Sequence, residues 1–244
     1  MSELSAPSLA ILDELRTHEL LYTANDAINR ALGRRTVMPL IAPTGIGKTT
    51  VIQKTCEIDS EFYEVQGFTT RDRRPNEKLG EFRAFYPHND ESIRFIKELY
   101  DAGKLVQYTV HRDTGFIYGS TLEDYGPKFN MLPILSTNVE QFSNLSFHAV
   151  TPVALICTVE EWEHRFGQRA TTMDPVDVAK RLTEATRSLQ WSLAQADLPW
   201  VHNRQNKLEH TAEQLIAIAH SPKIDTEGPR NLGKQLLAHI ERNY

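Results

Sequence analysis

Residues 41–54 read IAPTGIGKTTVIQK, and this stretch decides the fold that the sequence predicts. The apolar run VMPLI comes before it, and a segment with helical spacing follows it. Glycine lets successive backbone N–H groups turn toward one small volume, and the start of a helix adds its positive end. A strand, a glycine-containing loop and a helix in this order are typical of a phosphate-binding loop. The pattern therefore predicts a loop that holds a nucleoside triphosphate.

The residues of this loop have separate predicted roles. Lys48 is expected to reach the β- and γ-phosphates, and the Thr49 hydroxyl to complete a Mg²⁺ coordination shell. Ala42 stands where this motif usually has glycine. An incidental glycine-rich turn would not require this order of elements. The predicted ATP-binding residues are Ala42, Pro43, Thr44, Gly45, Ile46, Gly47, Lys48, Thr49 and Thr50.

Composition and charge limit the class of protein. The chain has 244 residues, of which 40% are hydrophobic, and this length suits one α/β domain with an inserted lid or two small domains. A net charge of -5 and the lack of an aromatic-basic platform argue against nucleic acid as a partner. No apolar run is long enough for a membrane span, and the N-terminus does not resemble a signal peptide. We therefore expect a cytoplasmic protein with no membrane association, whose two cysteines are free thiols.

Alternating helical and strand patterns predict a largely parallel sheet flanked by helices. Pro39 is unusual in the first strand, because proline donates no ladder hydrogen bond. The tail from Pro222 is polar and then weakly amphipathic. The histidines, His111 and His164 among them, are expected to form no metal-ligand cluster. Helices are expected over 8–34 (one or two), 48–56, 89–103, 159–169, 174–196 and 211–221, and strands over 36–41, 105–111, 131–137, 149–159 and 198–203.

Four downstream stretches give the chain its family resemblance. They are TTRDRRPNE (69–77), GEFRAF (80–85), GFIYGST (115–121) and the arginine-bearing segment 159–185, followed by WVHN (200–203). In this order and spacing, over residues 37–218, the chain resembles the guanylate kinase family. The resemblance implies an α/β P-loop kinase fold, a three-layer α/β/α arrangement with a parallel central sheet. It also implies an N-terminal helical extension (1–35), a kinase-like domain (36–218) with a monophosphate-binding lobe (66–128) and a lid (165–181), and a C-terminal tail (219–244).

The same resemblance assigns roles to individual residues. Arg71 and Arg74 match two arginines that hold the phosphate of the acceptor monophosphate, and Tyr118 matches a tyrosine on that phosphate. Ser120 matches a hydroxyl near the base, and Asn203 matches the residue beside the donor adenine. The resemblance also implies that arginines of the lid approach the triphosphate and bridge the transferring group. The expected catalytic residues are Lys48, Arg71, Arg165, Arg169 and Arg181.

The chain departs from the family mainly where the base is read. Gln107 replaces a glutamate that accepts hydrogen bonds from guanine N1–H and N2–H, and Gly67 replaces a base-reading serine. Arg83 replaces a phosphate-contacting tyrosine, while Ser136 and Asn138 replace the family's Asp-x-Asp. An amide offers both an acceptor and a donor, so Gln107 is compatible with guanine, adenine or a pyrimidine. The expected substrate-binding residues are Arg71, Arg74, Arg83, Gln107, Tyr118, Ser120 and Asn138.

The leading hypothesis is a nucleoside monophosphate kinase that uses ATP and Mg²⁺, with GMP or dGMP as the default acceptor. A kinase for another monophosphate and a catalytically inactive binding module are the alternatives. A secretion-type motor ATPase is disfavoured, because the strands MLPILST and VALICTV do not end in an acidic Mg²⁺ ligand. The sequence is compatible with a monomer or a homodimer.

Overall fold

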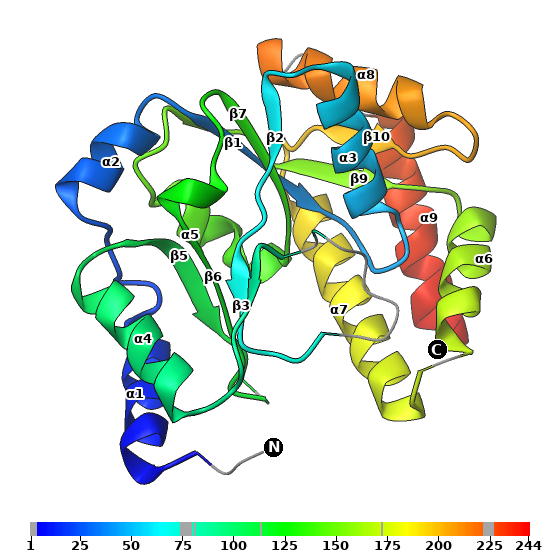
Figure 1. Ribbon diagram of the computed structural model, residues 1–244. Coiled ribbons are helices and arrows are strands. Elements are labelled where there is room, and N and C mark those ends of the chain that lie inside the picture. The colour runs from blue at the N-terminus through cyan, green and yellow to red at the C-terminus, as the bar shows by residue number, and fades with distance from the viewer. Residues whose placement is uncertain (1–3, 74–79, 81, 113, 172, 222–226) are drawn as a thin grey trace. The chain divides into compact units, whose positions relative to one another are not determined.

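The computed structural model describes residues 4–73, 80, 82–112, 114–171, 173–221 and 227–244 (Figure 1). The chain divides into two compact units, each assembled from several segments. The first unit comprises Met1–Arg35, Val65–Lys128 and Gln141–Ala149, and the second comprises Thr36–Glu64, Phe129–Glu140 and Val150–Tyr244. Among the described residues, no helix combines the length and the apolar character needed to cross a membrane.

The second unit is built on the parallel sheet that the sequence predicts. Its strands are ordered β10-β9-β1-β7-β2, and every pairing along this path is parallel. The central strand β1 has five buried residues in succession, as expected for a parallel strand covered on both faces. The bounds are β1 (Thr36–Ile41), β2 (Phe62–Glu64), β7 (Phe129–Ile134), β9 (Val153–Ile156) and β10 (Trp200–His202), and the short β8 (Ala149–Val150) also pairs with β1.

Two groups of helices cover this sheet and complete the α/β architecture. Helix α3 packs beside α8 and against β2 and β7, while α9 packs against β9 and β10 with α6 and α7 beside it (Figure 1). Asp174 caps α7 and Pro175 is its first residue, which confirms the predicted start of that helix. The bounds are η2 (Ser136–Asn138), α3 (Lys48–Ile58), α5 (Val139–Ser143), α6 (Val159–Ala170), α7 (Pro175–Ala194), α8 (Leu208–His220) and α9 (Glu227–Asn243).

Pro39 remains inside the central strand, and the sheet accommodates it through its register. On one side β1 pairs with β7 along its whole length, from Thr36 to Ile41. On the other side its pairing with β9 begins only at Leu40, one residue after the proline. The missing proline N–H therefore removes little from the ladder.

The first unit contains a smaller sheet in the order β4-β3-β6-β5. Helices α1 and α4 lie side by side (Figure 1) and share an apolar core with β5, to which Leu12, Leu15, Ile96 and Tyr108 contribute. The N-terminal helix α1 is thus part of the core of this unit. The bounds are α1 (Ala6–His18), α2 (Asp26–Leu32), β3 (Phe68–Thr69), β4 (Ala84–Phe85), α4 (Asp90–Asp101), β5 (Leu105–Val110), β6 (Ile117–Thr121) and η1 (Leu122–Asp124).

The C-terminal tail is more structured than its sequence indicates. Residues 227–243 form α9, and Leu236 and Ile240 are buried in the main core. Gly233 lies close to the sheet, because a Cβ there would lie 2.6 Å from the Trp200 ring. The helix packs closely because this position has no side chain.

We expect Gly233→Ala to lower the free energy of unfolding by about 1–3 kcal/mol, because the added methyl group overpacks against Trp200. Gly228→Ala in the same helix is the matched control, since a Cβ there meets nothing within 4 Å. The control should leave stability unchanged or raise it by up to about 1 kcal/mol. Urea unfolding of the two variants measures the difference, and equal stabilities would contradict this account of α9.

Candidate active site

The phosphate-binding loop has the backbone shape that its glycines permit. Gly45 and Gly47 adopt φ values of 87° and 97°, in the left-handed region that other residues rarely occupy. Gly47 is also the N-cap of α3, so the helix begins directly at Lys48. A Cβ at Gly47 would lie 2.9 Å from Asn203 Nδ2, so conformation and close packing both require glycine there. The first N–H groups of α3 and the loop thus form an anion-binding end.

Side chains from two other elements hold the loop in this shape. The Ile46 carbonyl accepts hydrogen bonds from Asn203 Nδ2 at 2.7 Å and from Arg165 at 3.0 Å. Trp162 donates its indole N–H to the Thr44 carbonyl at 3.1 Å, and its ring stacks on Phe166. Asn203 follows β10, while the other three side chains come from α6. Asn203 and Arg165 therefore lie on the predicted loop, where both bind its backbone.

Lys48 lies in a strongly basic environment. Its ammonium donates to the Ala42 carbonyl at 2.5 Å, across the loop. Burial lowers the pKa of Lys48 to about 8, Glu184 opposes this shift, and Arg181 and Arg169 add to it. Arg181 forms an ion pair with Glu184 at 3.1 Å. The structure thus brings three of the predicted catalytic cations into one electrostatic cluster around the loop.

Other predicted residues of this unit lie at the same edge of the sheet. Thr49 is half-buried and Thr50 is exposed in the first turn of α3. Asn138 lies in η2, just beyond β7, and accepts a hydrogen bond from Thr137 at 2.9 Å. Because β1 and β7 are parallel and Ile41 pairs with Ile134, η2 and the phosphate-binding loop follow the carboxyl ends of neighbouring strands. Ligands of open α/β sheets bind at such an edge.

In the first unit, Arg71 is buried against aromatic rings. Only 6% of Arg71 is exposed, and its guanidinium lies 5.1 Å from the Phe82 ring centre and 5.6 Å from that of Phe85. Tyr118 is half-buried on β6, and its ring centre lies 6.1 Å from that of Phe82. Arg71 and Tyr118 therefore flank one ring, while Arg74 lies outside the described residues.

Arg83, predicted to bind substrate, is engaged within the protein. Its Nε donates to Asp124 at 2.5 Å, and Nη2 donates to Thr121 at 3.2 Å. The hydrogen bond to Asp124 is the main reason that the pKa of Arg83 is raised. The Asp124 carboxylate is fully buried and also caps η1, so its charge depends on Arg83. A phosphate would have to compete with this ion pair, which sequence reasoning did not identify.

The base-reading candidates Gln107 and Ser120 meet across two antiparallel strands. They are directly paired in the β5–β6 ladder, so their side chains share one face. Gln107 Nε2 donates to Ser120 Oγ at 3.3 Å, and Ser120 Oγ lies 2.9 Å from the hydroxyl of Tyr125. Tyr125 is buried and was not predicted from sequence. Its five-residue separation from Ser120 is a local signal, but only the fold shows the contact.

Gly67 has a structural reason to lack the serine side chain of the family. A Cβ at this position would lie 2.2 Å from the carbonyl oxygen of Gly119. Gly119 is similarly constrained, because its own Cβ would lie 2.5 Å from the Phe68 ring. The segment 67–69 and β6 therefore approach each other more closely than side chains at these two positions would allow.

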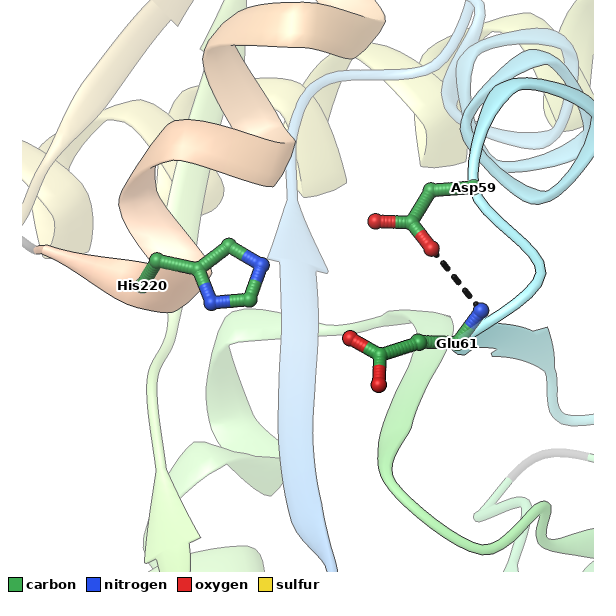
Figure 2. Close-up of side chains that lie close together, drawn as sticks. All are labelled: Asp59, Glu61 and His220. Carbon is green, nitrogen blue, oxygen red and sulfur yellow. Dashed lines mark hydrogen bonds between the residues drawn. The ribbon is translucent and has the colours of Figure 1, made fainter.

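One group of possible metal ligands lies at the far end of α3. Asp59, Glu61 and His220 have ligand atoms within 4.8 Å of one another (Figure 2), a grouping that the sequence did not predict. Asp59 accepts a hydrogen bond from the Glu61 backbone N–H at 2.9 Å, and the His220 ring packs edge-on against Phe129. Lys48 begins α3 and Asp59 is its C-cap, so the cluster is separated from the phosphate-binding loop by the length of the helix.

The depressed pKa of Lys48 predicts a pH-dependent stability. Between about pH 8 and the usual lysine pKa near 10.4, the unfolded chain binds more protons at this residue than the folded chain. The contribution of Lys48 to the free energy of unfolding therefore rises with pH across this window. We expect the stability difference between the native chain and Lys48→Met to change in favour of the native chain from pH 7 to pH 10. Urea unfolding with Lys54→Met as the same-helix control checks this, and equal pH slopes for both variants would refute it.

Known proteins resemble this chain over most of its length. It is 26% identical over 193 residues to a guanylate kinase of Methylobacillus flagellatus, covering 77% of this chain and 90% of that one. It is 27% identical over 207 residues to a guanylate kinase of Oceanobacillus iheyensis, covering 81% and 93%. No family model matches the chain. The crystal structure of a guanylate kinase from Anaplasma phagocytophilum has a TM-score of 0.50 at 19% identity, covering 84% of this chain and 95% of that one. The predicted resemblance is confirmed: the chain is guanylate kinase-like in sequence and in fold.

Proposed function

We propose that the chain is a nucleoside monophosphate kinase that transfers the γ-phosphoryl group of ATP to GMP or dGMP, giving GDP or dGDP and ADP. The cluster of cations around the phosphate-binding loop carries this proposal. Lys48, Arg169 and Arg181 interact electrostatically, and Glu184 is the acidic residue that opposes them at Lys48. Positive side chains that act on one another in this way favour the binding of negative charge. A triphosphate supplies that charge.

The second unit supplies the groups for the donor. Backbone N–H groups of the loop and the start of α3 would hold the β- and γ-phosphates, and Lys48 would move from the Ala42 carbonyl to a phosphate oxygen. Arg169 and Arg181 would stabilise the charge that spreads over the transferring group. Asn203 and Arg165, both bound to the Ile46 carbonyl, would keep the loop rigid during the reaction.

Mg²⁺ fits the donor side of this site. The Thr49 hydroxyl follows Lys48 in the first turn of α3, and no other described side chain is hydrogen-bonded to it. A hard oxygen donor in this position is the type of ligand that Mg²⁺ prefers beside phosphates. When bound, the ion would neutralise part of the negative charge of the phosphates. Thr49 would hold it in place.

The acceptor side of the reaction needs binding and orientation rather than a base. A phosphate oxygen of the monophosphate is already anionic, so it attacks the γ-phosphorus directly. The bond from the γ-phosphorus to the bridging oxygen breaks, and ADP leaves with the electron pair. Arg71 would bind the acceptor phosphate, since its guanidinium already lies against two aromatic rings and loses little freedom on binding. Tyr118 would donate its hydroxyl to the same phosphate.

A coupled ADP-release assay with Mg²⁺-ATP tests the proposal, with GMP, dGMP, AMP, IMP, UMP, CMP and dTMP as acceptors. We expect acceptor-dependent turnover with GMP and dGMP. Lys48→Ala should reduce kcat by at least about 100-fold, because it removes a positive charge that stabilises the transferring group.

Lys54→Ala is the matched control, since this lysine lies in the same helix and pairs with Glu57 at the surface. The control should keep the native rate within about twofold. Nucleotide binding without acceptor-dependent ADP formation would instead favour a catalytically inactive binding module. Turnover with a different monophosphate would keep the kinase and change its substrate.

A further inference from the structure

We propose that Gln107 presents only its carbonyl oxygen to the base, so that the site accepts 6-oxopurine monophosphates as a class, IMP as well as GMP. This inference rests on the proposed function, because it takes Gln107 to face the base of the acceptor. The chain differs at this position from the glutamate of the guanylate kinase family, which accepts two hydrogen bonds from guanine.

The contacts of Gln107 fix which end of its amide is available. Nε2 donates to Ser120 Oγ at 3.3 Å, while Oε1 has no hydrogen-bond partner among the described residues. Ser120 is 1% exposed and its Oγ lies 2.9 Å from the Tyr125 hydroxyl. Either hydroxyl of this Ser120–Tyr125 pair can be the donor, and in both cases Ser120 Oγ has a lone pair left to accept from Gln107. The serine oxygen therefore holds the amide nitrogen on its side.

The backbone of β5 around Gln107 is also held in place by hydrogen bonds. The ladder between β5 and β6 shifts register between Leu105 and Gln107, which is the signature of a β-bulge, and bulges re-aim side chains beside functional sites. On the N-terminal side of the bulge, Tyr22 donates to the Leu105 carbonyl at 2.9 Å. On its C-terminal side, Gln141 donates to the Tyr108 carbonyl at 2.8 Å.

The N-terminal segment completes this support. Glu19 accepts hydrogen bonds from the Thr109 hydroxyl and, at 3.2 Å, from the Val110 backbone N–H. Strand β5 is at the edge of its sheet, so these side chains satisfy groups that another strand would otherwise pair. Strand β5, which carries Gln107, is therefore held from both sides. The Gln107 amide would then meet the base in one orientation.

A single acceptor in this orientation selects for a donor on the base. Guanine and hypoxanthine both carry an N1–H beside a 6-oxo group, and each can donate it to Oε1. The 2-amino group that distinguishes guanine finds no second acceptor on an amide, whereas a carboxylate has one. Adenine has an acceptor at N1, so two lone pairs would face each other where guanine and hypoxanthine donate N1–H, and its 6-amino donor lies at a different position on the ring. The site should thus reject AMP but distinguish GMP poorly from IMP.

Titration calorimetry of the full chain with GMP, IMP and AMP tests this reading without requiring turnover. We expect Kd values for GMP and IMP within about threefold of each other and AMP at least tenfold weaker. Gln107→Glu should raise the preference for GMP over IMP at least tenfold, because a second acceptor becomes available for the 2-amino group. A native preference for GMP over IMP of tenfold or more would overturn the inference, as would the absence of monophosphate binding.

Tyr125→Phe tests whether Tyr125, through Ser120, positions the amide of Gln107. Without the phenol, the amide is free to rotate, so discrimination between IMP and AMP should fall severalfold while the ratio of GMP to IMP stays near one. Tyr63→Phe is the control, since Tyr63 is an exposed tyrosine of the second unit. Ser120→Ala should act in the same direction as Tyr125→Phe if the latter does not fold. If both variants fold and neither changes the discrimination between IMP and AMP, Tyr125 and Ser120 do not position the amide.

The ADP-release assay separates this inference from the proposed function. The expected binding pattern without ADP formation would overturn the kinase and leave the base preference standing. Turnover restricted to AMP or to pyrimidine monophosphates would leave a kinase and overturn the 6-oxopurine preference.

Discussion

The conformation of the phosphate-binding loop depends on hydrogen bonds to the Ile46 carbonyl. This carbonyl accepts hydrogen bonds from Asn203, beyond β10, and from Arg165 on α6, so two distant parts of the second unit are joined to one peptide. Because Gly47 comes next and is the N-cap of α3, these contacts also set the direction of the helix and of Lys48. Hydrogen bonds with a charged or buried partner are among the stronger polar contacts in proteins. The loop is therefore arranged before any ligand binds, which favours catalysis by preorganised charge.

Charged and polar side chains are paired differently in the two units. In the second unit, the positive charges of Arg169 and Arg181 act on Lys48 at the loop, and the negative charge of Glu184 opposes them. In the first unit, polar side chains satisfy one another: Arg83 neutralises buried Asp124, and Gln107, Ser120 and Tyr125 form a continuous chain. Concentrated charge suits phosphate, which brings its own negative charge. A hydrogen-bond network suits a neutral base, which in our proposal is recognised by Oε1 of Gln107.

Local signals predicted much of the fold, because they act over a few residues. The glycine loop, the helix expected over 89–103 and the Asp174-Pro175 helix start all appear as expected. Helix α9 was underestimated, since its apolar residues are spaced by polar ones and its close contact, Gly233 on Trp200, joins distant positions. The same limit explains the ion pair of Arg83 with Asp124 and the grouping of His220 with Asp59. Such pairs carry no local pattern, and only the folded chain brings them together.

The close approach of Gly67 to Gly119 bears on how the base preference of this protein can be redesigned. Grafting a carboxylate onto position 107 changes one side chain on an existing backbone. Grafting the missing serine onto position 67 is a different problem, because its Cβ would occupy the space of a backbone oxygen 2.2 Å away. A full conversion to the recognition pattern of the family must therefore separate segment 67–69 from β6 before it exchanges side chains. In this lobe the spacing of the backbone, as well as the choice of side chains, encodes specificity.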